Sequence, residues 1–327
     1  MTSQGSIRYC WVVTDGRAGS VNQCVGLAEA LGLDPVVKRV RMRMPWRKLS
    51  PYFRLGHAYA FAPDSDPLEP PWPDLLIASG RLSIAAALHV RTRSRRDGHR
   101  TMIVFVQSPG ISPRHFDLVI APAHDRVRGS NVVTTRGGLH RLTQAKLDEG
   151  AARLLPLVRH LPEPYIGVLI GGTNGVYTMD AAQIGLLADR LVQAAKQTGG
   201  SLLITPSRRT GDSNIAHLRE ALASVPTFIW NGEGENPYFG LLGLSNFIIA
   251  TNDSVNMISE AASTGKPVYI FELPGYSRKF ATFHRTMAEA GLTKSFLGQI
   301  EAFQRPAAIN ETVQAAGAVS AKALEIL

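Results

Sequence analysis

The chain has 327 residues, a net charge of +9, and a composition of 45% hydrophobic and 19% charged residues. These values are typical of a globular protein with one large or two ordinary domains, and they exclude an intrinsically disordered chain. No apolar run reaches the length of a membrane span, and the first residues show no signal-peptide pattern. We therefore expect a cytoplasmic protein, and peripheral contact with the inner membrane stays open.

The positive charge is concentrated in the first half of the chain. Residues 1–160 contain 23 Lys and Arg against 12 Asp and Glu, whereas the remaining residues contain 12 against 14. This asymmetry indicates an anionic partner, such as acidic lipid headgroups or a phosphorylated substrate, although a generally basic proteome explains it equally well. Arginines and aromatic residues alternate over residues 39–54, which is typical either of contact with an anionic membrane or of a helix with a buried aromatic face. Nucleic acid is the partner that we expect least.

Short apolar runs alternate with helical segments along the first half of the chain. Strands are predicted over residues 7–13, 36–40, 75–78, 102–106, 118–121 and 132–134. Helices are predicted over residues 21–31, 82–95 and 143–158. Because the strand candidates are hydrophobic throughout, we expect parallel strands that are covered on both faces. The sequence His-Leu-Pro-Glu-Pro at 160–164 then ends the last helix and predicts a hinge.

The same alternation starts again after residue 164. Strands are predicted over residues 166–170, 202–205, 227–230, 247–250 and 268–271, and helices over residues 181–197, 215–223, 254–264, 280–290 and 307–327. The restart predicts an α/β protein of two Rossmann-like domains, residues 1–160 and 161–327, that face each other across a cleft. The C-terminal helix is free to pack back on the first domain. Ligands of open α/β sheets bind beyond the carboxyl ends of the strands, so polar loops at these ends are the candidate sites.

The loop at 14–20, Thr-Asp-Gly-Arg-Ala-Gly-Ser, follows the first predicted strand and precedes a helix. Its small residues allow a ligand to approach closely, and the helix N-terminus favours an anion. The loop matches neither the GxGxxG pattern of nicotinamide sites nor the phosphate loop of nucleoside triphosphatases. Asp15 is placed to act as a general base, or, equally well, Asp15 and Ser20 cap the turn and the helix.

Two polar loops follow the first two predicted strands of the second half. The loop at 171–175, Gly-Gly-Thr-Asn-Gly, has the glycines of a tight turn around a phosphate or a sugar. The loop at 205–211 carries two arginines beside hydroxyl groups, and guanidinium groups bind phosphate oxygens in pairs. Solvated turns are the alternative for both loops. We favour a binding role for the arginine loop because it ends a strand.

Residues 251–262, Thr-Asn-Asp-Ser-Val-Asn-Met-Ile-Ser-Glu-Ala-Ala, form the most informative motif. A polar turn after an apolar strand opens a helix whose first amides have no partner in the helix and can hold a diphosphate. Glu260 lies nearly two turns into this helix, where its carboxylate can accept hydrogen bonds from ribose hydroxyls. The alternative is that Asp253 caps the helix and Glu260 is a surface charge, and we favour the binding role.

These motifs resemble the donor half of glycosyltransferases with the GT-B fold, in which a Ser- and Thr-rich loop, a helix and a downstream glutamate hold a nucleotide-diphosphate sugar. The segments at 14–23, 171–180, 205–211 and 253–275 are similar to a narrower glycosyltransferase-like family, and this resemblance covers nearly the whole chain. The family is related to the plant mitochondrial-fission "elongated mitochondria" proteins and is also labelled nucleoside-diphosphate-sugar epimerase. The resemblance implies a GT-B-like fold with the nucleotide sugar in the second half.

The resemblance also implies roles for single residues. Asp15 would be the catalytic base that faces the acceptor. Further residues would lie on the acceptor side: Gly16, Arg17, Gly19, Asn22 and His124. His124 also suits a structural role, in which it pins a loop together with Asp125. Residues of the second half would bind the donor: Gly171, Gly172, Asn174, Ser207, Arg208, Asn231, Ser254, Val255, Asn256, Met257 and Glu260.

The reaction implied is a metal-independent glycosyl transfer to an unidentified acceptor, which is membrane-associated or anionic. No group of His, Cys and carboxylate residues has ligand spacing, so we expect no metal and no cofactor beside the nucleotide sugar. Asp15 would deprotonate the acceptor hydroxyl, while the amides at 254–257 and Arg208 stabilise the departing diphosphate. Two alternatives remain open: an epimerase of the same fold, and a non-catalytic scaffold recruited to a membrane.

Overall fold

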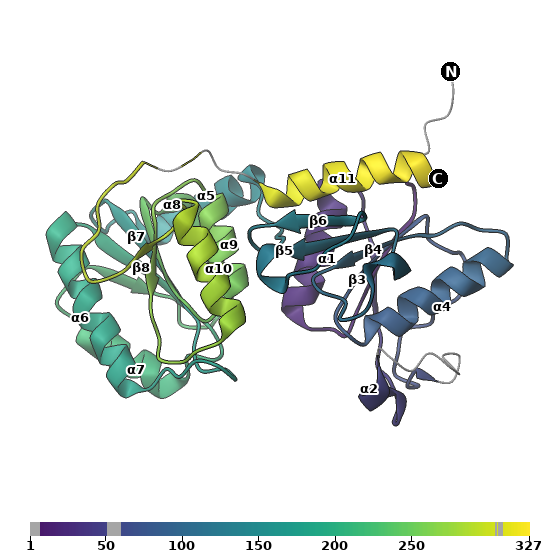
Figure 1. Cartoon of the computed structure of the whole chain (residues 1–327). Helices are drawn as coiled ribbons and strands as arrows, with labels where there is room; N and C mark the ends of the chain where they lie inside the picture. Colours follow the sequence, from purple (N-terminus) through teal and green to yellow (C-terminus); the bar gives the residue numbers. More distant parts are fainter. Residues whose placement is uncertain (1–6, 51–59, 305, 307–309) are drawn as a thin grey trace, which may run out of the picture. The chain divides into compact units, whose positions relative to one another are not determined.

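The computed structural model describes residues 7–50, 60–304, 306 and 310–327 of the chain. It consists of two compact units (Figure 1). Unit 1 comprises Met1–Arg141 and Asn310–Leu327, and unit 2 comprises Leu142–Ile309. Each unit contains one six-stranded parallel sheet with helices against it, so the prediction of an α/β protein with two Rossmann-like halves is confirmed.

The sheet of unit 1 has the strand order β2-β1-β3-β4-β5-β6. Its strands are β1 (Cys10–Thr14), β2 (Val36–Arg39), β3 (Leu75–Ser79), β4 (Met102–Val106), β5 (Leu118–Pro122) and β6 (Val132–Thr135). Every residue of β1, β3, β4 and β5 is buried, which explains why these strands read as continuous apolar runs. The strand order reverses between β1 and β3, and the ligand crevice of an open sheet lies at the carboxyl ends of such a pair.

Helices cover both faces of this sheet. Residues Cys10 and Val12 of β1 pack with α1 (Ala18–Ala30) and α11 (Glu311–Ile326). Their neighbours Trp11 and Val13 pack with α4 (Ser83–Arg96) on the other face, as the alternation of side chains along a strand requires.

The helix α11 returns to unit 1 from the far end of the sequence (Figure 1). Its first residue, Glu311, forms an ion pair of 2.9 Å with Arg136, and the Thr312 hydroxyl accepts a hydrogen bond of 3.0 Å from the amide of His140. The C-terminal helix is therefore a part of the first sheet's cover.

The sheet of unit 2 has the strand order β12-β11-β10-β7-β8-β9, so its order reverses between β7 and β10. Its strands are β7 (Tyr165–Ile170), β8 (Ser201–Pro206), β9 (Thr227–Ile229), β10 (Phe247–Thr251), β11 (Val268–Phe271) and β12 (Lys294–Ser295). Its helices are α5 (Gln144–Val158), α6 (Ala181–Thr198), α7 (Asp212–Ala221), α8 (Tyr238–Leu244), α9 (Val255–Ser263) and α10 (Arg278–Glu289). One apolar core lies between the sheet and α6 and α7, and the other lies on the face covered by α5, α8, α9 and α10.

The units divide the chain at residue 141, and not at the boundary between 160 and 161 that we expected from the sequence. The reason is α5, which packs on α8 of unit 2 through facing glycines, Gly150 and Gly240. The segment 160–164 lies inside unit 2, where the carbonyl of Pro162 accepts a hydrogen bond of 2.6 Å from the Ser201 hydroxyl. The structure therefore does not support a hinge between the units at these prolines.

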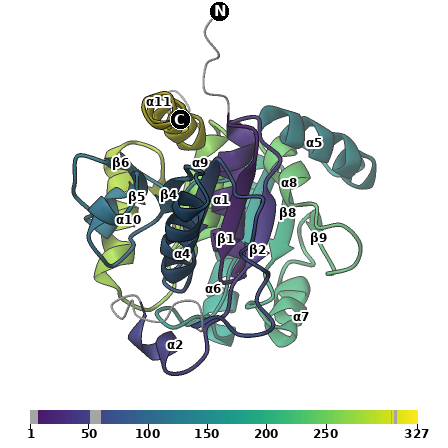
Figure 2. The ribbon, with the colours of Figure 1, turned by 90° about the vertical axis from the view of Figure 1, so that its right-hand side faces the viewer.

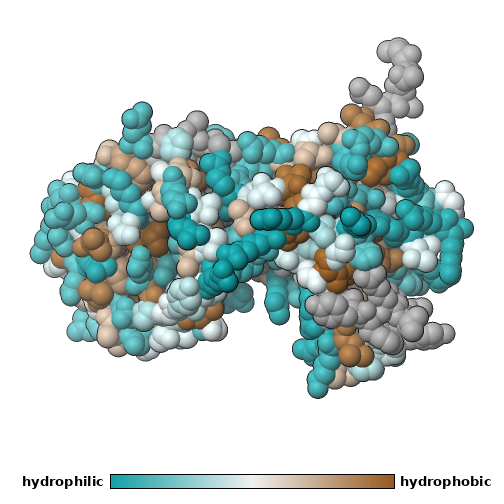
Figure 3. Space-filling model, in the orientation of Figure 1, coloured by the Kyte–Doolittle hydropathy of each residue, from teal (hydrophilic) through white to brown (hydrophobic). Residues whose placement is uncertain are grey.

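The basic and aromatic stretch at 39–54 is only partly helical. In the described part it contains the end of β2, a single bridge between Met42 and Phe61, and the short helix α2 (Trp46–Leu49). Tyr52, Phe53 and Arg54 lie outside the described residues. Two views show α2 projecting from the rest of unit 1 (Figure 1, Figure 2). Its exposed surface combines apolar Met44 and Leu49 with basic side chains, a mixture that the hydropathy colouring also shows (Figure 3).

In the part of the chain that the structure describes, no helix is both long enough and apolar enough to cross a bilayer.

The contact between α5 and α8 gives a stability prediction. A Cβ atom at Gly150 would lie 2.6 Å from the Gly240 amide nitrogen, so Gly150→Ala forces the two backbones apart. We expect this substitution to lower the free energy of unfolding by about 1–3 kcal/mol, the usual effect of overpacking. The measurement is hydrogen exchange of peptides from unit 2.

The matched control is Gly185→Ala in α6, where a Cβ atom meets nothing within 4 Å. Alanine favours the helix at such a position, so this variant should be as stable as the parent or up to about 1 kcal/mol more stable. Equal exchange rates in both variants would show that the close contact of the glycines is unimportant.

Candidate functional site

The candidate site of unit 2 lies where its strand order reverses. The loops that follow β7 and β10 start at Gly171 and Asn252, on adjacent strands of the sheet, and the loop after β8 flanks them. All three loops were singled out in the sequence as polar segments at strand ends. Their common position is the place at which open α/β sheets bind ligands.

A buried carboxylate, Asp253, connects these three loops. One carboxylate oxygen accepts hydrogen bonds from the Gly172 amide at 3.1 Å and from the Arg209 guanidinium at 2.6 Å. The other accepts a hydrogen bond of 2.6 Å from the Thr251 hydroxyl. We call these four residues the Asp253 network. The side chain of Asp253 is 0% exposed, so the network supplies the charged and hydrogen-bonding partners that a buried carboxylate needs.

The two glycines after β7 make room for this network. A Cβ atom at Gly171 would lie 2.1 Å from Asp253 Oδ1, and one at Gly172 would lie 2.1 Å from the carbonyl oxygen of Arg209. The φ angle of Gly172 is +155°, which also disfavours other residues. Both glycines were predicted to bind the donor. Their structural role is to let the loops after β7, β8 and β10 approach one another.

Some polar groups of the loop after β8 form hydrogen bonds within unit 2, and others lie at the surface. The hydroxyls of Ser207 and Thr210 both donate to the carbonyl of Gly171, each at 2.6 Å. Arg209 is 43% exposed and binds Asp253, whereas Arg208, the exposed arginine that we predicted to bind phosphate, is not part of the Asp253 network. Nothing in the sequence distinguishes the two neighbouring arginines.

The helix α9 begins directly after Asp253. Its N-cap is Ser254, whose hydroxyl accepts a hydrogen bond from the Met257 amide at 3.4 Å, and not Asp253 as the alternative interpretation had it. Asn174 supports this turn because its side-chain amide donates to the carbonyl of Asp253 at 3.2 Å. The Val255 and Asn256 amides lie in the first turn, where the positive end of the helix dipole favours an anion.

Glu260 is not a surface charge. It is partly buried, and its carboxylate accepts a hydrogen bond of 2.5 Å from the hydroxyl of Tyr238, the first residue of α8. Burial raises the pKa of Glu260 to about 7, although the hydrogen bond from Tyr238 opposes this shift. The pKa of Tyr238 is raised well above its ordinary value by burial and by the charge of Glu260. Tyr238 was missed in the sequence because α8 is short and shows no clear helical period.

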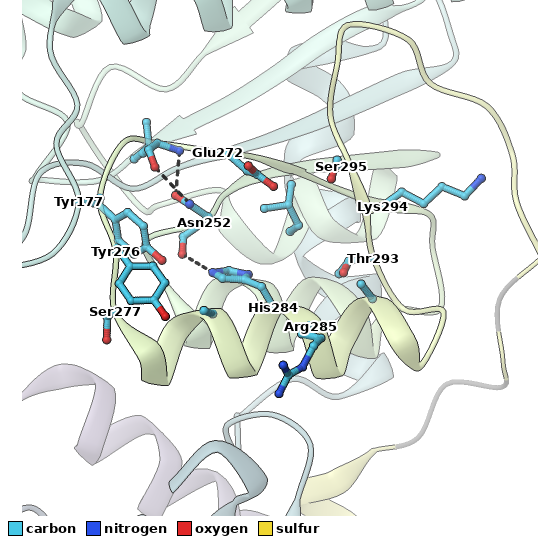
Figure 4. Close-up of a pocket in the computed structure, with 15 residues that line it drawn as sticks. Tyr177, Asn252, Glu272, Tyr276, Ser277, His284, Arg285, Thr293, Lys294 and Ser295 are labelled. Atoms are coloured by element: carbon cyan, nitrogen blue, oxygen red, sulfur yellow. Dashed lines mark hydrogen bonds between the residues drawn. The ribbon is translucent and has the colours of Figure 1, made fainter.

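A pocket of about 360 Å³ lies beside the loop after β10 and is bordered by α10 (Figure 4). Polar and aromatic side chains line most of it: Tyr177, Asn252, Glu272, Tyr276, Ser277, His284, Arg285, Thr293, Lys294 and Ser295. Asn252 belongs both to this lining and to the turn that precedes Asp253. The pocket is thus continuous with the segment that carries the start of α9.

His284, in the lining of the pocket, is held by the turn that precedes Asp253. Its Nε2 lies 2.9 Å from the carbonyl oxygen of Asn252, and a carbonyl only accepts, so Nε2 carries the proton (Figure 4). Burial lowers the pKa of His284, which keeps the ring neutral. The Nδ1 atom is buried and has no hydrogen-bond partner within the described residues.

The remaining donor-site prediction, Asn231, lies in an exposed turn after β9. Its side chain accepts a hydrogen bond from the Glu233 amide and donates one to the Glu233 carboxylate, both at 3.1 Å. These contacts shape the turn itself. A contact with a nucleotide base remains a prediction.

In unit 1, Asp15 follows β1 at the position where that sheet's order reverses. Its carboxylate lies 3.4 Å from Arg17 Nε and accepts a hydrogen bond of 3.3 Å from the Arg17 amide. Gly80, after β3, leaves the space beside this carboxylate free, since a Cβ atom there would touch Asp15 at 3.5 Å. Asp15 thus caps its own turn and also lines a pocket of about 470 Å³. Ser20 does not cap α1, whose N-cap is Arg17.

The other acceptor-side predictions lie at different depths in unit 1. Gly16 and Asn22 are exposed, and Gly19 is partly exposed at the start of α1. The side chain of His124 is only 3% exposed and lies 3.8 Å from Asp125, which accepts a hydrogen bond of 3.0 Å from the Ser108 amide. This geometry favours the interpretation in which His124 and Asp125 pin a loop.

A family model described as Mitochondrial fission ELM1 matches residues 18–323. The chain belongs to this family. The Mitochondrial fission protein ELM1 of Arabidopsis thaliana is 29% identical over 394 residues, which cover 96% of this chain and 91% of the relative. The resemblance to the fission-related family that the sequence motifs suggested is therefore confirmed.

Solved structures show that this ELM1-family chain has a GT-B-like fold. MurG from Acinetobacter baumannii matches with a TM-score of 0.51 at 14% identity, over 98% of this chain and 93% of that chain. UDP-GlcNAc 2-epimerase from Methanocaldococcus jannaschii matches with a TM-score of 0.51 at 10% identity, over 94% of this chain and 91% of that chain. Identities this low establish the fold and leave the reaction open.

The Asp253 network gives the second prediction. Asp253→Asn removes the charge that faces Arg209 and places an amide group among hydrogen-bond donors. We expect this variant of the ELM1-family chain to lose about 3 kcal/mol of unfolding free energy, in the range found when a buried ion pair is broken. The measurement is the midpoint of urea unfolding together with hydrogen exchange of the loops after β7 and β8.

The control is Asp180→Asn at the N-cap of α6, where the side chain accepts a hydrogen bond from the Gln183 amide. Asparagine caps helices as well as aspartate does, so this variant should unfold like the parent. A similar result for Asp253→Asn would mean that the carboxylate charge does not hold the loops together.

Proposed function

We propose that this protein is a metal-independent glycosyltransferase whose unit 2 binds a nucleotide-diphosphate sugar. The observation that carries the proposal is the arrangement at the end of β10. The loops there are fixed by the Asp253 network, the first turn of α9 follows directly, and Glu260 lies further along the same helix. Each of these features suits the binding of one portion of a nucleotide sugar.

The diphosphate is proposed to bind at the first turn of α9. Backbone amides at a helix start hold phosphate oxygens without a metal ion, and the helix dipole stabilises the negative charge. Exposed Arg208 is free to reach toward a phosphate, because its neighbour Arg209 already neutralises Asp253. These groups are proposed to stabilise the diphosphate as it leaves the sugar, so no metal or cofactor takes part.

The ribose and the sugar are proposed to bind on opposite sides of the diphosphate. Glu260, held by Tyr238, would accept hydrogen bonds from the ribose hydroxyls. The sugar would enter the pocket beside Asn252, where Glu272 and Ser277 offer polar groups (Figure 4). A pocket of about 360 Å³ is within the range of small-molecule sites.

The acceptor is proposed to bind in unit 1, with Asp15 as the general base. A carboxylate that lines a pocket at a strand end is suited to take the proton of an attacking hydroxyl. The second candidate is an epimerase acting on the nucleotide sugar alone. It is favoured by the likeness to UDP-GlcNAc 2-epimerases, which matches that to MurG in TM-score. We place the protein in the cytoplasm, where nucleotide sugars are available.

The first test of the proposal is binding of nucleoside diphosphates. We expect one of UDP, GDP, CDP and ADP to raise the thermal unfolding midpoint, because a ligand that binds only the folded state stabilises it. Glu260→Ala should weaken that binding by about tenfold or more, the loss expected of hydrogen bonds to a charged group. The control is Glu220→Ala on the exposed side of α7, which should bind like the parent.

The nucleotide that binds then decides between the reactions. NMR of its sugar derivatives would show epimerisation without an acceptor, whereas a transferase leaves the sugar unchanged until an acceptor is added. Absence of binding by all four nucleotides to the folded protein would overturn the proposal and favour a scaffold.

The raised pKa of Glu260 predicts that nucleotide affinity depends on pH. The ribose hydroxyls donate to the carboxylate form, which predominates well above the folded-state pKa of about 7 and is lost as the pH falls through that value. Below that value the affinity should fall by up to about tenfold per pH unit. The measurement is calorimetric titration of the nucleotide from about pH 5, near the ordinary pKa of a glutamate, to about pH 8, above the raised pKa of Glu260.

The nucleotide phosphates also titrate in this interval, so the pH profile of Glu260→Gln serves as the reference. The ratio of the two affinities isolates the contribution of Glu260. A ratio that is constant with pH would show that this carboxylate does not contact the ligand.

A further inference from the structure

The pocket of unit 1 has a composition that the role of Asp15 does not explain. Arginines from three successive parts of the chain line it: Arg17 before α1, Arg41 after β2, and Arg47 in α2. The carboxylates in the lining are Asp15 and Asp64. The guanidinium groups thus outnumber the carboxylates around a volume of about 470 Å³.

The cations of this pocket are only partly neutralised. Arg17 pairs with Asp15 at 3.4 Å, and Arg41 pairs with Asp64 at 2.7 Å. Arg47 has no carboxylate partner among the residues that the structure describes. The pocket therefore keeps a net positive charge beside the proposed catalytic base.

Two further arginines add positive charge near the same place. Arg81 donates to the carbonyls of Ser50 at 2.7 Å and Arg47 at 3.1 Å, which positions α2 without consuming a carboxylate. The aliphatic part of Arg39 lies over Gly16, where a Cβ atom would be 3.6 Å away. Hydrogen bonds to carbonyls leave the charge of a guanidinium in place, so the local field stays positive.

The existing ion pairs are of a kind that a ligand can replace. Both partners of the Arg41–Asp64 pair are exposed, at 72% and 56%, whereas in the Arg17–Asp15 pair Arg17 is 84% exposed and Asp15 is 12% exposed. Exposed pairs contribute little free energy, about 0–1 kcal/mol, because water solvates both partners well. A doubly charged group can therefore recruit these arginines at small cost, and guanidinium groups bind phosphate oxygens two at a time.

The rest of the lining is apolar. Val40, Met42, Ala62 and Leu82 make up the apolar part of the wall. A free inorganic ion gains nothing from such a wall, whereas the carbon skeleton of an organic phosphate buries against it.

We propose that this pocket binds a phosphate or diphosphate group carried by the acceptor, with Arg47 as its principal ligand and with Arg17 and Arg41 closing on it. The statement that the phosphate belongs to the acceptor rests on the proposed function. The anion-binding site itself does not depend on that function. The phosphate belongs either to a soluble phosphorylated compound or to a lipid headgroup, and both present the same chemistry to the arginines.

The test uses inorganic pyrophosphate as the probe for the full-length protein. Calorimetric titration is carried out with nucleoside diphosphate at saturation, which blocks the proposed diphosphate site of unit 2. Arg47→Gln should weaken pyrophosphate binding by about tenfold or more, as expected for the loss of a charge-assisted hydrogen bond. Arg43→Gln is the matched control, since Arg43 is an exposed arginine of the same segment that does not line the pocket. It should bind like the parent.

Vesicles of phosphatidylcholine, with and without phosphatidic acid, then distinguish the two sources of phosphate. Cosedimentation that is lost in Arg47→Gln and kept in Arg43→Gln would place the phosphate on a lipid. Pyrophosphate binding without cosedimentation would place it on a soluble compound. Equal effects of the two substitutions on pyrophosphate binding and on cosedimentation would overturn the inference, because they would reflect general charge and not a site.

Failure of this inference can be told apart from failure of the proposed function. If no nucleoside diphosphate binds and pyrophosphate binding still depends on Arg47, the anion site stands and only its connection to glycosyl transfer is lost. If a nucleoside diphosphate binds and the two arginine variants behave alike, the anion site is wrong and the nucleotide site stands.

Discussion

The buried carboxylate of Asp253 is the interaction on which the candidate site of unit 2 depends. Burying an unpaired charge would cost several kcal/mol, so the carboxylate is tolerated only because Gly172, Thr251 and Arg209 satisfy it together. Each partner comes from a different loop at the end of a strand. A single charge thereby fixes the distance between three loops, and the first turn of α9 takes its position from the residue next to that charge.

The two units share the position of their candidate loops in the sheet, but their basic side chains have different partners. In both sheets the strand order reverses beside the loop that holds the candidate residues. In unit 2, Arg209 and Lys266 are bound internally: Arg209 to Asp253, and Lys266 to the carbonyls of Leu242 and Gly243. Burial lowers the pKa of Lys266 to about 8, as expected of a structural amine. In unit 1, Arg17 and Arg41 after the strand ends have side chains that are 84% and 72% exposed.

The sequence predicted the strands well because burial on both faces leaves an unbroken apolar run, and β4 and β11 match the predicted bounds. It also predicted the loops at the strand ends and the start of α9. It did not predict that Gly150 binds α5 to unit 2, because helical periodicity does not show which helix a glycine faces. It did not distinguish Arg208 from Arg209 either, since only the fold decides which of two adjacent side chains reaches Asp253. Tyr238 was missed because its role is to hold Glu260, a contact 22 positions away in sequence.

The hydrogen bond between Tyr238 and Glu260 shows why a binding carboxylate needs a second residue. Burial alone would favour the protonated carboxyl group, which accepts hydrogen bonds poorly. The Tyr238 hydroxyl stabilises the charged form and keeps the pKa of Glu260 at about 7 and not higher. The carboxylate is then available near neutral pH. The proposed ligand, by donating two hydroxyls to it, would stabilise the charged form further. Tyr238 therefore positions Glu260 and stabilises its charged form.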